Sequence, residues 1–236
     1  MDVRPSPFWL STLDPRPSTP MRLGIFGGSF DPVHNGHLAL ARACQRQAAL
    51  DEVWFTPTAV QPLKHEGPHA TDAQRVEMLE LAIDTDPSEP SEPGRPRPRF
   101  SWRICTLEID RGGLSYTIDT LRQLHAELPD ADLFFLIGSD TLRDVARWKE
   151  PRQIFRLATP LVVHRAGEPA PDLALLASFC TPDTQPRRIE MPACDISSTE
   201  IRRRLASGGK LDDLVPRAVA NFIATNSIYA RSKGHR

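Results

Sequence analysis

The chain has 236 residues, of which 40% are hydrophobic and 25% charged, and its formal net charge is -1. This length suits one large α/β domain or one domain with appendages, and the near-neutral charge argues against a nucleic-acid polymer as partner. No apolar run approaches the roughly 20 residues of a membrane span, and the first residues lack the apolar core of a signal peptide. The four cysteines have no C-x-x-C spacing, which favours reduced, mostly buried thiols. We therefore expect a cytoplasmic protein that has no contact with a membrane.

Two proline-rich segments stand apart from the rest of the chain. Residues 1–20 hold five prolines and show no period of 2 or 3.6, which predicts a disordered extension. Residues 86–99 are also rich in proline, and they predict a surface insertion because proline breaks helices and central strands. Residues 21–231 then form a single domain, with Met21 directly before its first strand.

The domain alternates short apolar strands with amphipathic helices. In chain order we expect a strand at 22–26, a helix at 38–48, a strand at 53–56, a helix at 72–83, an extended segment at 100–109, a helix at 117–128, strands at 132–137 and 160–164, and helices after 198. Repeated β-α-β order implies an α/β fold with a parallel sheet and helices on both faces. Right-handed crossovers make this a Rossmann-like, doubly wound sheet, here with a small C-terminal helical portion.

The most informative motif is the string GGSFDPVHNGH at residues 27–37, which joins the first strand to the first helix. Doubly wound sheets bind ligands at this end of their strands. Gly27 and Gly28 leave space for a ligand against the backbone. His34 and His37 are three residues apart at a helix start, so both can face one pocket. Because the free N–H groups of a helix start suit an anion, the motif predicts a phosphate site.

A second candidate for phosphate binding is the string DISSTEIR at residues 195–202. Ser197 or Ser198 is expected to cap a helix, and the hydroxyls and amides of its first turn again suit an anion. Arg202, one turn further on, can fork onto phosphate oxygens. An ordinary capped helix with a solvated basic face explains the same residues, and this segment alone favours that plainer interpretation.

Together the two motifs resemble those of the H-x-G-H nucleotidyltransferase superfamily, and the eleven-residue string is similar to that of bacterial nicotinate-nucleotide adenylyltransferases. The resemblance covers about residues 21–230. It implies transfer of AMP from ATP to nicotinate mononucleotide, which gives nicotinate adenine dinucleotide and pyrophosphate in NAD biosynthesis. ATP and the mononucleotide would then be the small-molecule partners, and a homo-oligomer is compatible with the sequence. Mg²⁺ would accompany ATP and be held mainly by substrate phosphates, since no carboxylate cluster suggests a protein cage.

The resemblance also implies roles for individual residues. His34 and His37 would be catalytic and contact the phosphate oxygens around the reacting phosphorus. Further residues that would bind ATP are Gly27, Gly28, Ser29, Phe30, Ser197, Ser198, Thr199 and Arg202. Residues that would bind the mononucleotide are Lys64, Ser115, Tyr116, Thr117, Asp140 and Trp148, with Trp148 stacked on the pyridine ring. Arg165 is a weaker candidate near the adenine.

Plainer explanations and related reactions compete with these assignments. Ser115 or Thr117 can simply cap a helix, Trp148 can pack against the sheet, and Lys64 can be a solvated loop residue. Leu63 stands where the family often has a histidine, and His65 follows Lys64 instead. Pantetheine-phosphate adenylyltransferases and alcohol-phosphate cytidylyltransferases also carry H-x-G-H, and a non-catalytic nucleotide sensor can share the fold. The S-Y-T segment and Trp148 favour a pyridine nucleotide.

Overall fold

The structure of the protein is a computed structural model that describes residues 19–63, 67–84, 101–211 and 213–230. The expected extension at residues 1–20 lies almost wholly outside the described residues, and the expected insertion at residues 86–99 lies wholly outside them. Lys64 also lies outside them, so its expected role stays a prediction.

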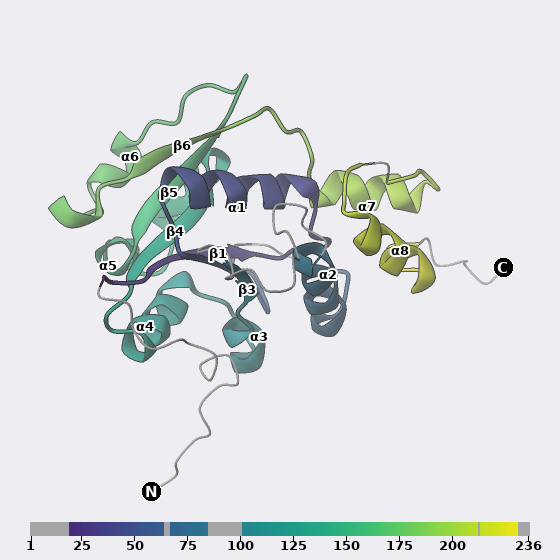
Figure 1. Ribbon diagram of the computed structural model, residues 1–236, viewed down its shortest axis with the longest axis horizontal. Helices are drawn as coiled ribbons and strands as arrows, with labels where there is room; N and C mark the ends of the chain where they lie inside the picture. The colour runs from purple at the N-terminus through teal and green to yellow at the C-terminus, as the bar shows by residue number, and fades with distance from the viewer. Residues whose placement is uncertain (1–18, 64–66, 85–100, 212, 231–236) are drawn as a thin grey trace, which may run out of the picture.

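Six parallel strands form one sheet in the order β3-β2-β1-β4-β5-β6 (Figure 1). Their bounds are β1 (Arg22–Gly28), β2 (Glu52–Pro57), β3 (Ser101–Ile104), β4 (Asp132–Gly138), β5 (Thr159–Arg165) and β6 (Arg187–Met191). The chain first moves outward from β1 to β3 and then crosses back to β4 on the other side of β1. This order confirms the expected Rossmann-like, doubly wound fold, and it places a switch point, where such sheets bind ligands, between β1 and β4.

The strands form because they are short apolar runs whose two faces are both covered. Successive side chains of a strand point to opposite faces of a sheet. Accordingly, Ile25 and Phe135 pack into one hydrophobic cluster while their neighbours Phe26 and Phe134 pack into the other. Continuous apolar runs of this kind are typical of buried parallel strands. The central strands are therefore fixed from both sides, and their carboxyl ends are a rigid base for a site.

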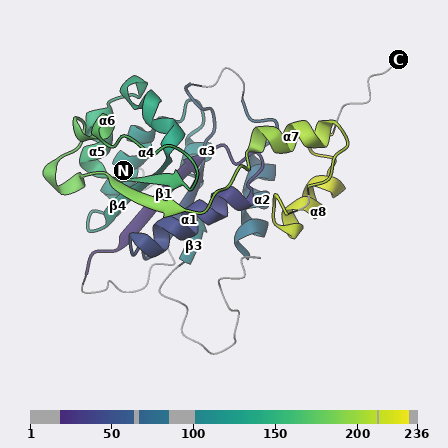
Figure 2. The same ribbon diagram turned by 90° about the horizontal axis from the view of Figure 1, so that it is seen from above.

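Helices cover both faces of the sheet (Figure 1). One face packs against α1 (Asn35–Gln47), α2 (Asp72–Asp84) and α8 (Arg217–Thr225), and the other against α3 (Leu107–Arg111), α4 (Thr117–Glu127) and α5 (Pro151–Leu157). The short helices η2 (Ser139–Arg147), α6 (Ala174–Ala177) and η3 (Pro182–Thr184) lie between the later strands. Seen from above, α7 (Ser198–Ala206) and α8 stand beside α2 at one end of the molecule, which is the expected C-terminal helical portion (Figure 2).

The expectation of an extended segment at residues 100–109 is wrong in its second half. Strand β3 ends at Ile104, and helix α3 begins at Leu107. The hydroxyl of Thr106 donates to the Asp110 carboxylate at 2.7 Å, so it stabilises the first turn of this helix. The apolar and polar residues alternate here as in a strand, and a helix of one turn is too short to show its own period.

Several short elements were not expected from the sequence. They are β6, α5, α6, η2 and η3. Strand β6 lies at the edge of the sheet and buries only Ile189 and Met191, which leaves too few apolar residues for a clear pattern. None of the described helices is both long enough and apolar enough to cross a membrane.

Candidate active site

The two glycines at the end of β1 leave space for different groups, Gly28 for the ring of Phe30 and Gly27 for a cavity. Gly27 and Gly28 pair with Thr56 and Pro57 of β2 as the last residues of the strand. A side-chain carbon at Gly28 would lie 3.1–3.3 Å from ring atoms of Phe30, so the absent side chain makes room for that ring. Gly27 instead lines the cavity described below. Of the two, only Gly27 keeps space open for a ligand.

Phe30 supports the motif through the packing of its ring. Phe30 has a left-handed backbone with φ of 46°, and its side chain is fully buried. Its ring lies 5.0 Å from the imidazole of His37, measured between centroids. Any contact of Phe30 with a ligand would therefore have to come from its backbone, while its ring holds the histidine in place.

His34 and His37 cap helix α1 reciprocally. The N–H of His37 approaches Nδ1 of His34 at 3.3 Å, and the N–H of His34 donates to Nδ1 of His37 at 3.2 Å. The two rings are stacked with centroids 3.6 Å apart. A ring nitrogen that accepts a hydrogen bond carries no proton, so in the neutral form both imidazoles bear their proton on Nε2. The helix cap therefore sets both side chains as Nε2–H donors.

His34 is neutral under ordinary conditions. Its side chain is buried, and this burial, together with the positive charge of Arg165, lowers its pKa to about 3. A neutral imidazole still donates one hydrogen bond, and it can do so to a phosphate oxygen without forming an ion pair. The site thus offers a fixed, uncharged donor where the sequence predicts phosphate.

Asp31 joins the first motif to three other segments. Its carboxylate accepts hydrogen bonds from the N–H groups of His69 and Ala70 at 2.8 and 3.0 Å and from the Tyr229 hydroxyl at 2.6 Å. Its backbone oxygen accepts from Arg202 at 2.7 Å. Burial alone would raise the pKa of Asp31, but the hydrogen bonds and the charge of Arg202 together hold it below its usual value. The carboxylate is therefore ionised and fully used within the protein.

The second motif caps α7 and contacts the first motif. Ser197 is the N-cap, and its hydroxyl accepts from the N–H of Glu200 at 3.2 Å. The Ser198 hydroxyl donates to the backbone oxygen of Pro32 at 2.9 Å. Two strings that are far apart in the sequence thus meet at the end of β1.

Arg202 is directed toward the first motif rather than toward solvent. Besides its bond to the Asp31 oxygen, it donates to the Thr199 hydroxyl at 3.3 Å. Arg203, the next residue, makes the exposed pair with Glu200 at 2.7 Å that a solvated basic face predicts. Arg203 therefore belongs to a solvated basic face, whereas Arg202 lies where both motifs can contact the same anion.

Sequence reasoning missed Arg75 of α2, whose fully buried side chain supports the motif from behind. Its guanidinium donates to the backbone oxygens of Ser29 and Thr58, both at 2.7 Å, and to the Asp72 carboxylate at 2.6 Å. These bonds tie the loop after β1 to the loop after β2. In the sequence, Arg75 looks like any solvated cation of an amphipathic helix, so no local signal distinguished it.

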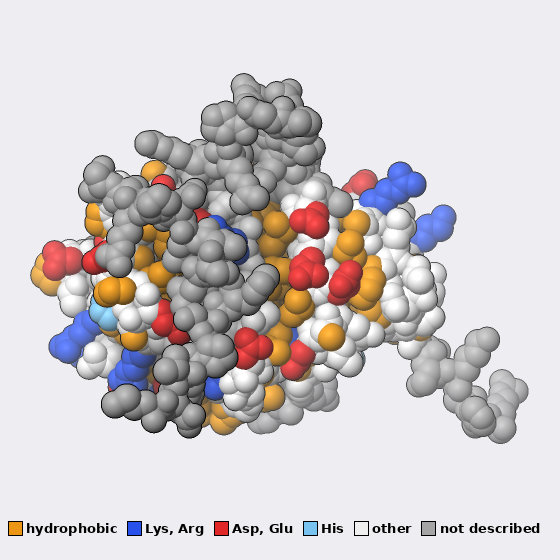
Figure 3. Space-filling view, turned by 60° about the horizontal axis from the view of Figure 1, so that its bottom comes forward, with side chains coloured by type: hydrophobic (Ala, Val, Ile, Leu, Met, Phe, Trp, Pro, Cys, Tyr) orange, Lys and Arg blue, Asp and Glu red, His pale blue; other side chains and the backbone are white. Residues whose placement is uncertain are grey.

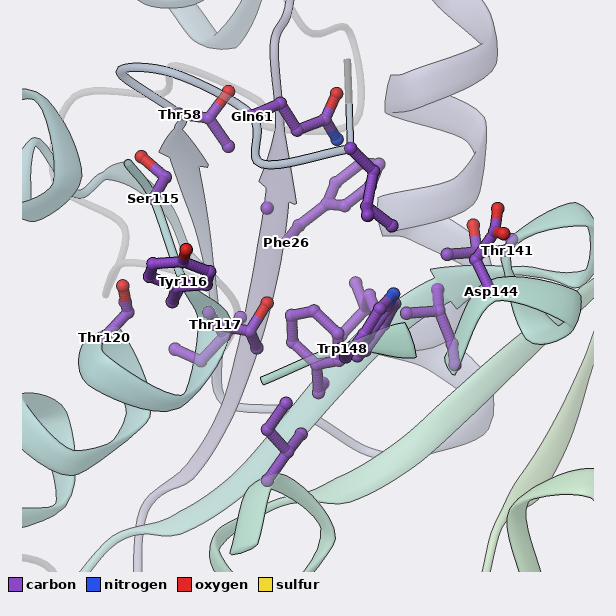
Figure 4. A pocket seen from close by; sticks show the side chains of 18 of the residues that line it. Phe26, Thr58, Gln61, Ser115, Tyr116, Thr117, Thr120, Thr141, Asp144 and Trp148 are labelled. Atoms are coloured by element: carbon purple, nitrogen blue, oxygen red, sulfur yellow. The ribbon is translucent and has the colours of Figure 1, made fainter. Parts of the chain in front are cut away.

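A cavity of about 540 Å³ opens beside the carboxyl ends of β1 and β4 (Figure 4). In Figure 4, Tyr116, Thr117 and Thr120 at the start of α4 lie on one side, Thr141 and Asp144 lie on the other, and Trp148 lies between them. The residues expected from the sequence that line this cavity are Gly27, His37, Ser115, Tyr116, Thr117, Asp140, Trp148 and Arg165. The structure thus gathers the expected mononucleotide residues next to the expected phosphate site.

The start of α4 is built differently from the sequence expectation. Tyr116, not Ser115 or Thr117, is the N-cap residue, and no side chain caps this helix. The Ser115 hydroxyl instead accepts from the N–H of Ala59 at 2.9 Å, and the Ser115 N–H donates to the oxygen of Val60 at 2.8 Å. The S-Y-T segment therefore joins α4 to the loop after β2.

Glu108, also missed from the sequence, lies buried in the wall of the cavity. It accepts from the Thr120 hydroxyl at 2.7 Å, and its Oε2 atom has no hydrogen-bond partner among the described residues. Burial raises the pKa of this carboxyl, although the hydrogen bond from Thr120 and the charge of Arg111 oppose the rise. A glutamate in a five-residue helix gave no signal of burial.

Trp148 both packs and faces the cavity. Its indole lies 5.9 Å from the Phe135 ring and 6.3 Å from the Phe155 ring, measured between centroids. It also lines the cavity, so packing and ligand stacking are compatible. Asp140 follows β4, and its carboxylate folds over Gly138 so closely that a side-chain carbon there would lie 2.5 Å from Oδ1. Gly138 is thus required for the position of Asp140.

The charges around the site are mixed. The cavity is lined by the acidic residues Glu108, Asp140 and Asp144 and by the basic residues Arg147, Lys149 and Arg165. On the face shown in Figure 3, acidic and basic side chains are interspersed with hydrophobic ones, and the Lys and Arg side chains of the described residues form no continuous surface. The mixed charges of the cavity wall suit a small ligand that carries phosphates and other polar groups.

The chain is similar in sequence and in fold to known proteins. The cytidylyltransferase-like family profile matches residues 25–204. A probable nicotinate-nucleotide adenylyltransferase of Herpetosiphon aurantiacus is 39% identical over 209 residues, which cover 88% of this chain and 98% of the relative. One of Thermus thermophilus is 41% identical over 211 residues, which cover 89% of this chain and 100% of the relative. The nicotinic acid mononucleotide adenylyltransferase of Plasmodium falciparum, solved in complex with NaAD, has the same fold, with a TM-score of 0.65 at 17% identity over 88% of this chain and 97% of that one.

Proposed function

We propose that the site described above carries out the reaction of the nicotinate-nucleotide adenylyltransferase family, to which this chain belongs. The enzyme transfers AMP from ATP to nicotinate mononucleotide and produces nicotinate adenine dinucleotide and pyrophosphate. The observation that supports this site most directly is the contact between the two phosphate-binding motifs at Asp31, beside a cavity lined by Tyr116 and Trp148.

Adenylyl transfer requires alignment and charge stabilisation more than covalent chemistry from the protein. A phosphate oxygen of the mononucleotide attacks the α-phosphorus of ATP in line, and pyrophosphate leaves from the opposite side. His34 and His37 donate from Nε2 to oxygens around this phosphorus, and their mutual cap keeps them oriented before substrate binds. A preorganised donor of this kind is commonly worth about 100- to 1000-fold in rate.

The start of α7 and the side chain of Arg202 bind the β- and γ-phosphates. The Ser198 hydroxyl donates within the protein, whereas the hydroxyls of Ser197 and Thr199 only accept there. These two hydroxyls and the backbone N–H groups of the first turn therefore contact the phosphates. Arg202 keeps one N–H on the Asp31 oxygen, and its other donors can fork onto phosphate oxygens. Gly27, Gly28, Ser29 and Phe30 contribute backbone at the same place.

The cavity binds the mononucleotide. Trp148 stacks on the pyridine ring, and the uncapped start of α4 at Tyr116 and Thr117 offers N–H donors to the ring carboxylate. Ser115 positions this segment, and Asp140 accepts from the ribose hydroxyls. Lys64 would contact a phosphate from its loop.

A divalent cation, which we propose to be Mg²⁺, accompanies ATP. Among the described residues no three or more His, Cys, Asp or Glu side chains are grouped to hold a metal, which fits an ion held mainly by phosphate oxygens and water. When bound, this cation would neutralise part of the negative charge of the phosphates. We further propose that the enzyme works in the cytoplasm, where its four free cysteines stay reduced.

The experiment is a panel of phosphate acceptors incubated with purified protein, ATP and Mg²⁺, with pyrophosphate release as the measurement. We expect release with nicotinate mononucleotide and little with pantetheine phosphate or, when CTP replaces ATP, with choline phosphate. Release only with one of these alternative acceptors would assign the chain to a different transferase. Binding without release for every acceptor would indicate a nucleotide sensor.

A further inference from the structure

Lys149 follows Trp148 directly and lines the same cavity. Its ammonium lies 4.6 Å from the centre of the Tyr116 ring and 3.0 and 3.2 Å from the two carboxylate oxygens of Asp119. Tyr116 and Asp119 both belong to the start of α4, so the cation is held against the start of this helix. Because Trp148 and Lys149 line the same cavity, a pyridine ring stacked on Trp148 would share that cavity with this ammonium.

From this position we infer that Lys149 is a specificity-determining residue, which selects a pyridine nucleotide with an anionic ring substituent over one with a neutral carboxamide. The inference rests on the proposed function, since it concerns the substrate of the same site. Carboxylate and carboxamide have nearly the same shape, so the shape of a pocket separates them poorly. They differ by one full charge at neutral pH, and a fixed cation acts on that difference.

The other two cations in the cavity wall have different positions and partners. Arg147 pairs with Asp144 at 3.0 Å, and its side chain is 66% exposed. Arg165 pairs with Glu168 at 3.3 Å, and its charge acts on the buried His34 at the phosphate end of the site. Of the described cations that line the cavity, Lys149 is the one held against the start of α4, where we propose that the ring carboxylate binds.

The pairing of Lys149 with Asp119 is compatible with this role. An ammonium has three N–H donors, so it can keep a bond to Asp119 while it donates to a substrate carboxylate. Asp119 then acts as a positioning residue that holds the lysine at the start of α4. The acidic residues in the cavity wall disfavour an anionic ligand, which makes a local cation more necessary for one to bind.

A plainer role for Lys149 is a surface ion pair that links α4 to the segment before α5. The chain offers a matched control for that role, because Arg122 of α4 pairs with Glu150 at 2.6 and 3.1 Å and makes a similar link. Arg122 and Lys149 have similarly exposed side chains, at 48% and 41%. Arg122 also lies 4.0 Å from Asp119, but it does not line the cavity, so its loss removes a link while the charge of Lys149 stays in the cavity wall.

The experiment compares Lys149→Met, Lys149→Arg and Arg122→Met with the wild type, using nicotinate and nicotinamide mononucleotides. We expect Lys149→Met to lower kcat/KM for the acid about three- to fivefold, mainly through KM, as suits one half-exposed charge pair. The amide should change less than twofold, and Lys149→Arg should keep most of the preference. The wild-type preference should also weaken as salt rises, and that of Lys149→Met should not.

Arg122→Met should leave the ratio of acid to amide unchanged. An unchanged ratio in Lys149→Met, or an equal shift in Arg122→Met, would overturn the assignment of Lys149. Calorimetric binding of both mononucleotides gives the same ratio without turnover. Preferential binding without pyrophosphate release would therefore count against the proposed reaction and not against the role of the lysine.

Discussion

The hydroxyl of Tyr229 donates a 2.6 Å hydrogen bond to the carboxylate of Asp31, which lies 198 residues earlier in the chain. The same aspartate holds Arg202 through its backbone oxygen. The C-terminal segment is thereby connected to the two motifs that we propose to bind ATP. This connection suggests that the end of the chain positions the phosphate site as well as completing the fold.

Tyr229→Phe tests this connection by removing one hydroxyl. Because hydrogen bonds to charged groups are worth about 1.5–3 kcal/mol, we expect the free energy of unfolding to fall by about that amount. We also expect a several-fold rise in KM for ATP, since Asp31 and with it Arg202 lose a restraint. The KM for the mononucleotide is the internal control and should stay the same. Equal rises for both substrates would mean that the tyrosine has only a general structural role.

The Asp31→Asn variant tests how the lowered pKa of Asp31 makes the stability of the protein depend on pH. Hydrogen bonds and the charge of Arg202 hold the folded-state pKa of Asp31 below its usual value, so the carboxylate adds stability that is present above that usual value and lost as pH falls through the folded pKa. The free energy of unfolding of the wild type should therefore exceed that of the variant clearly at pH 6, and the difference should shrink toward pH 3. Other carboxylates titrate in both proteins and cancel. A difference that stays constant over this range would contradict the assignment.

Much of the fold can be predicted from the sequence because the signals are local. Residues 132–137 form one unbroken apolar run, which favours a buried parallel strand, and GGSFDPVHNGH combines a strand end, a turn and a helix start in eleven residues. The motif placed His34 and His37 correctly at the start of α1. The reciprocal cap could not be predicted, because either imidazole could as well face solvent.

The supporting residues of the site could not be predicted, because their environment depends on distant segments. Arg75 and Glu108 each look like a solvated charge on a helix, and Lys149 looks like a solvated charge in the segment before α5. Arg75 becomes buried only when the loops after β1 and β2 are both packed against α2. Glu108 becomes buried only when Thr120 folds back over it. Side chains that contact substrate can be recognised from their spacing in the sequence. The side chains that hold those groups in place are harder to recognise in this way.

His37→Ala tests the proposed catalytic donor. We expect a loss of at least about 100-fold in kcat, because an Nε2–H donor to the reacting phosphate is removed. The melting temperature should fall only modestly, since one of the two hydrogen bonds of the helix cap remains. His37→Asn is a useful companion, because its side-chain oxygen can again accept from the N–H of His34. It should recover stability more than activity, and activity of His37→Ala within threefold of the wild type would rule out the catalytic role.

Trp148→Ala separates stacking from charge recognition. An aromatic ring stacks equally on nicotinate and nicotinamide, so its removal should lower kcat/KM for both mononucleotides by a similar factor, about tenfold for one stacked ring. The ratio of acid to amide should be nearly unchanged, in contrast to the effect expected for Lys149→Met. Because the indole also packs on Phe135 and Phe155, the alanine variant will lose stability as well.

Trp148→Phe distinguishes the two consequences. Phenylalanine keeps an apolar ring against Phe135 and Phe155, so the melting temperature should recover, while a smaller ring restores stacking only in part. Kinetic constants are then compared at a temperature at which all variants are folded. If the acid-to-amide ratio falls in Trp148→Phe as much as in Lys149→Met, the indole orients the ring carboxylate toward the lysine. In that case Trp148 contributes to selectivity, and the stacking role proposed for it here is incomplete.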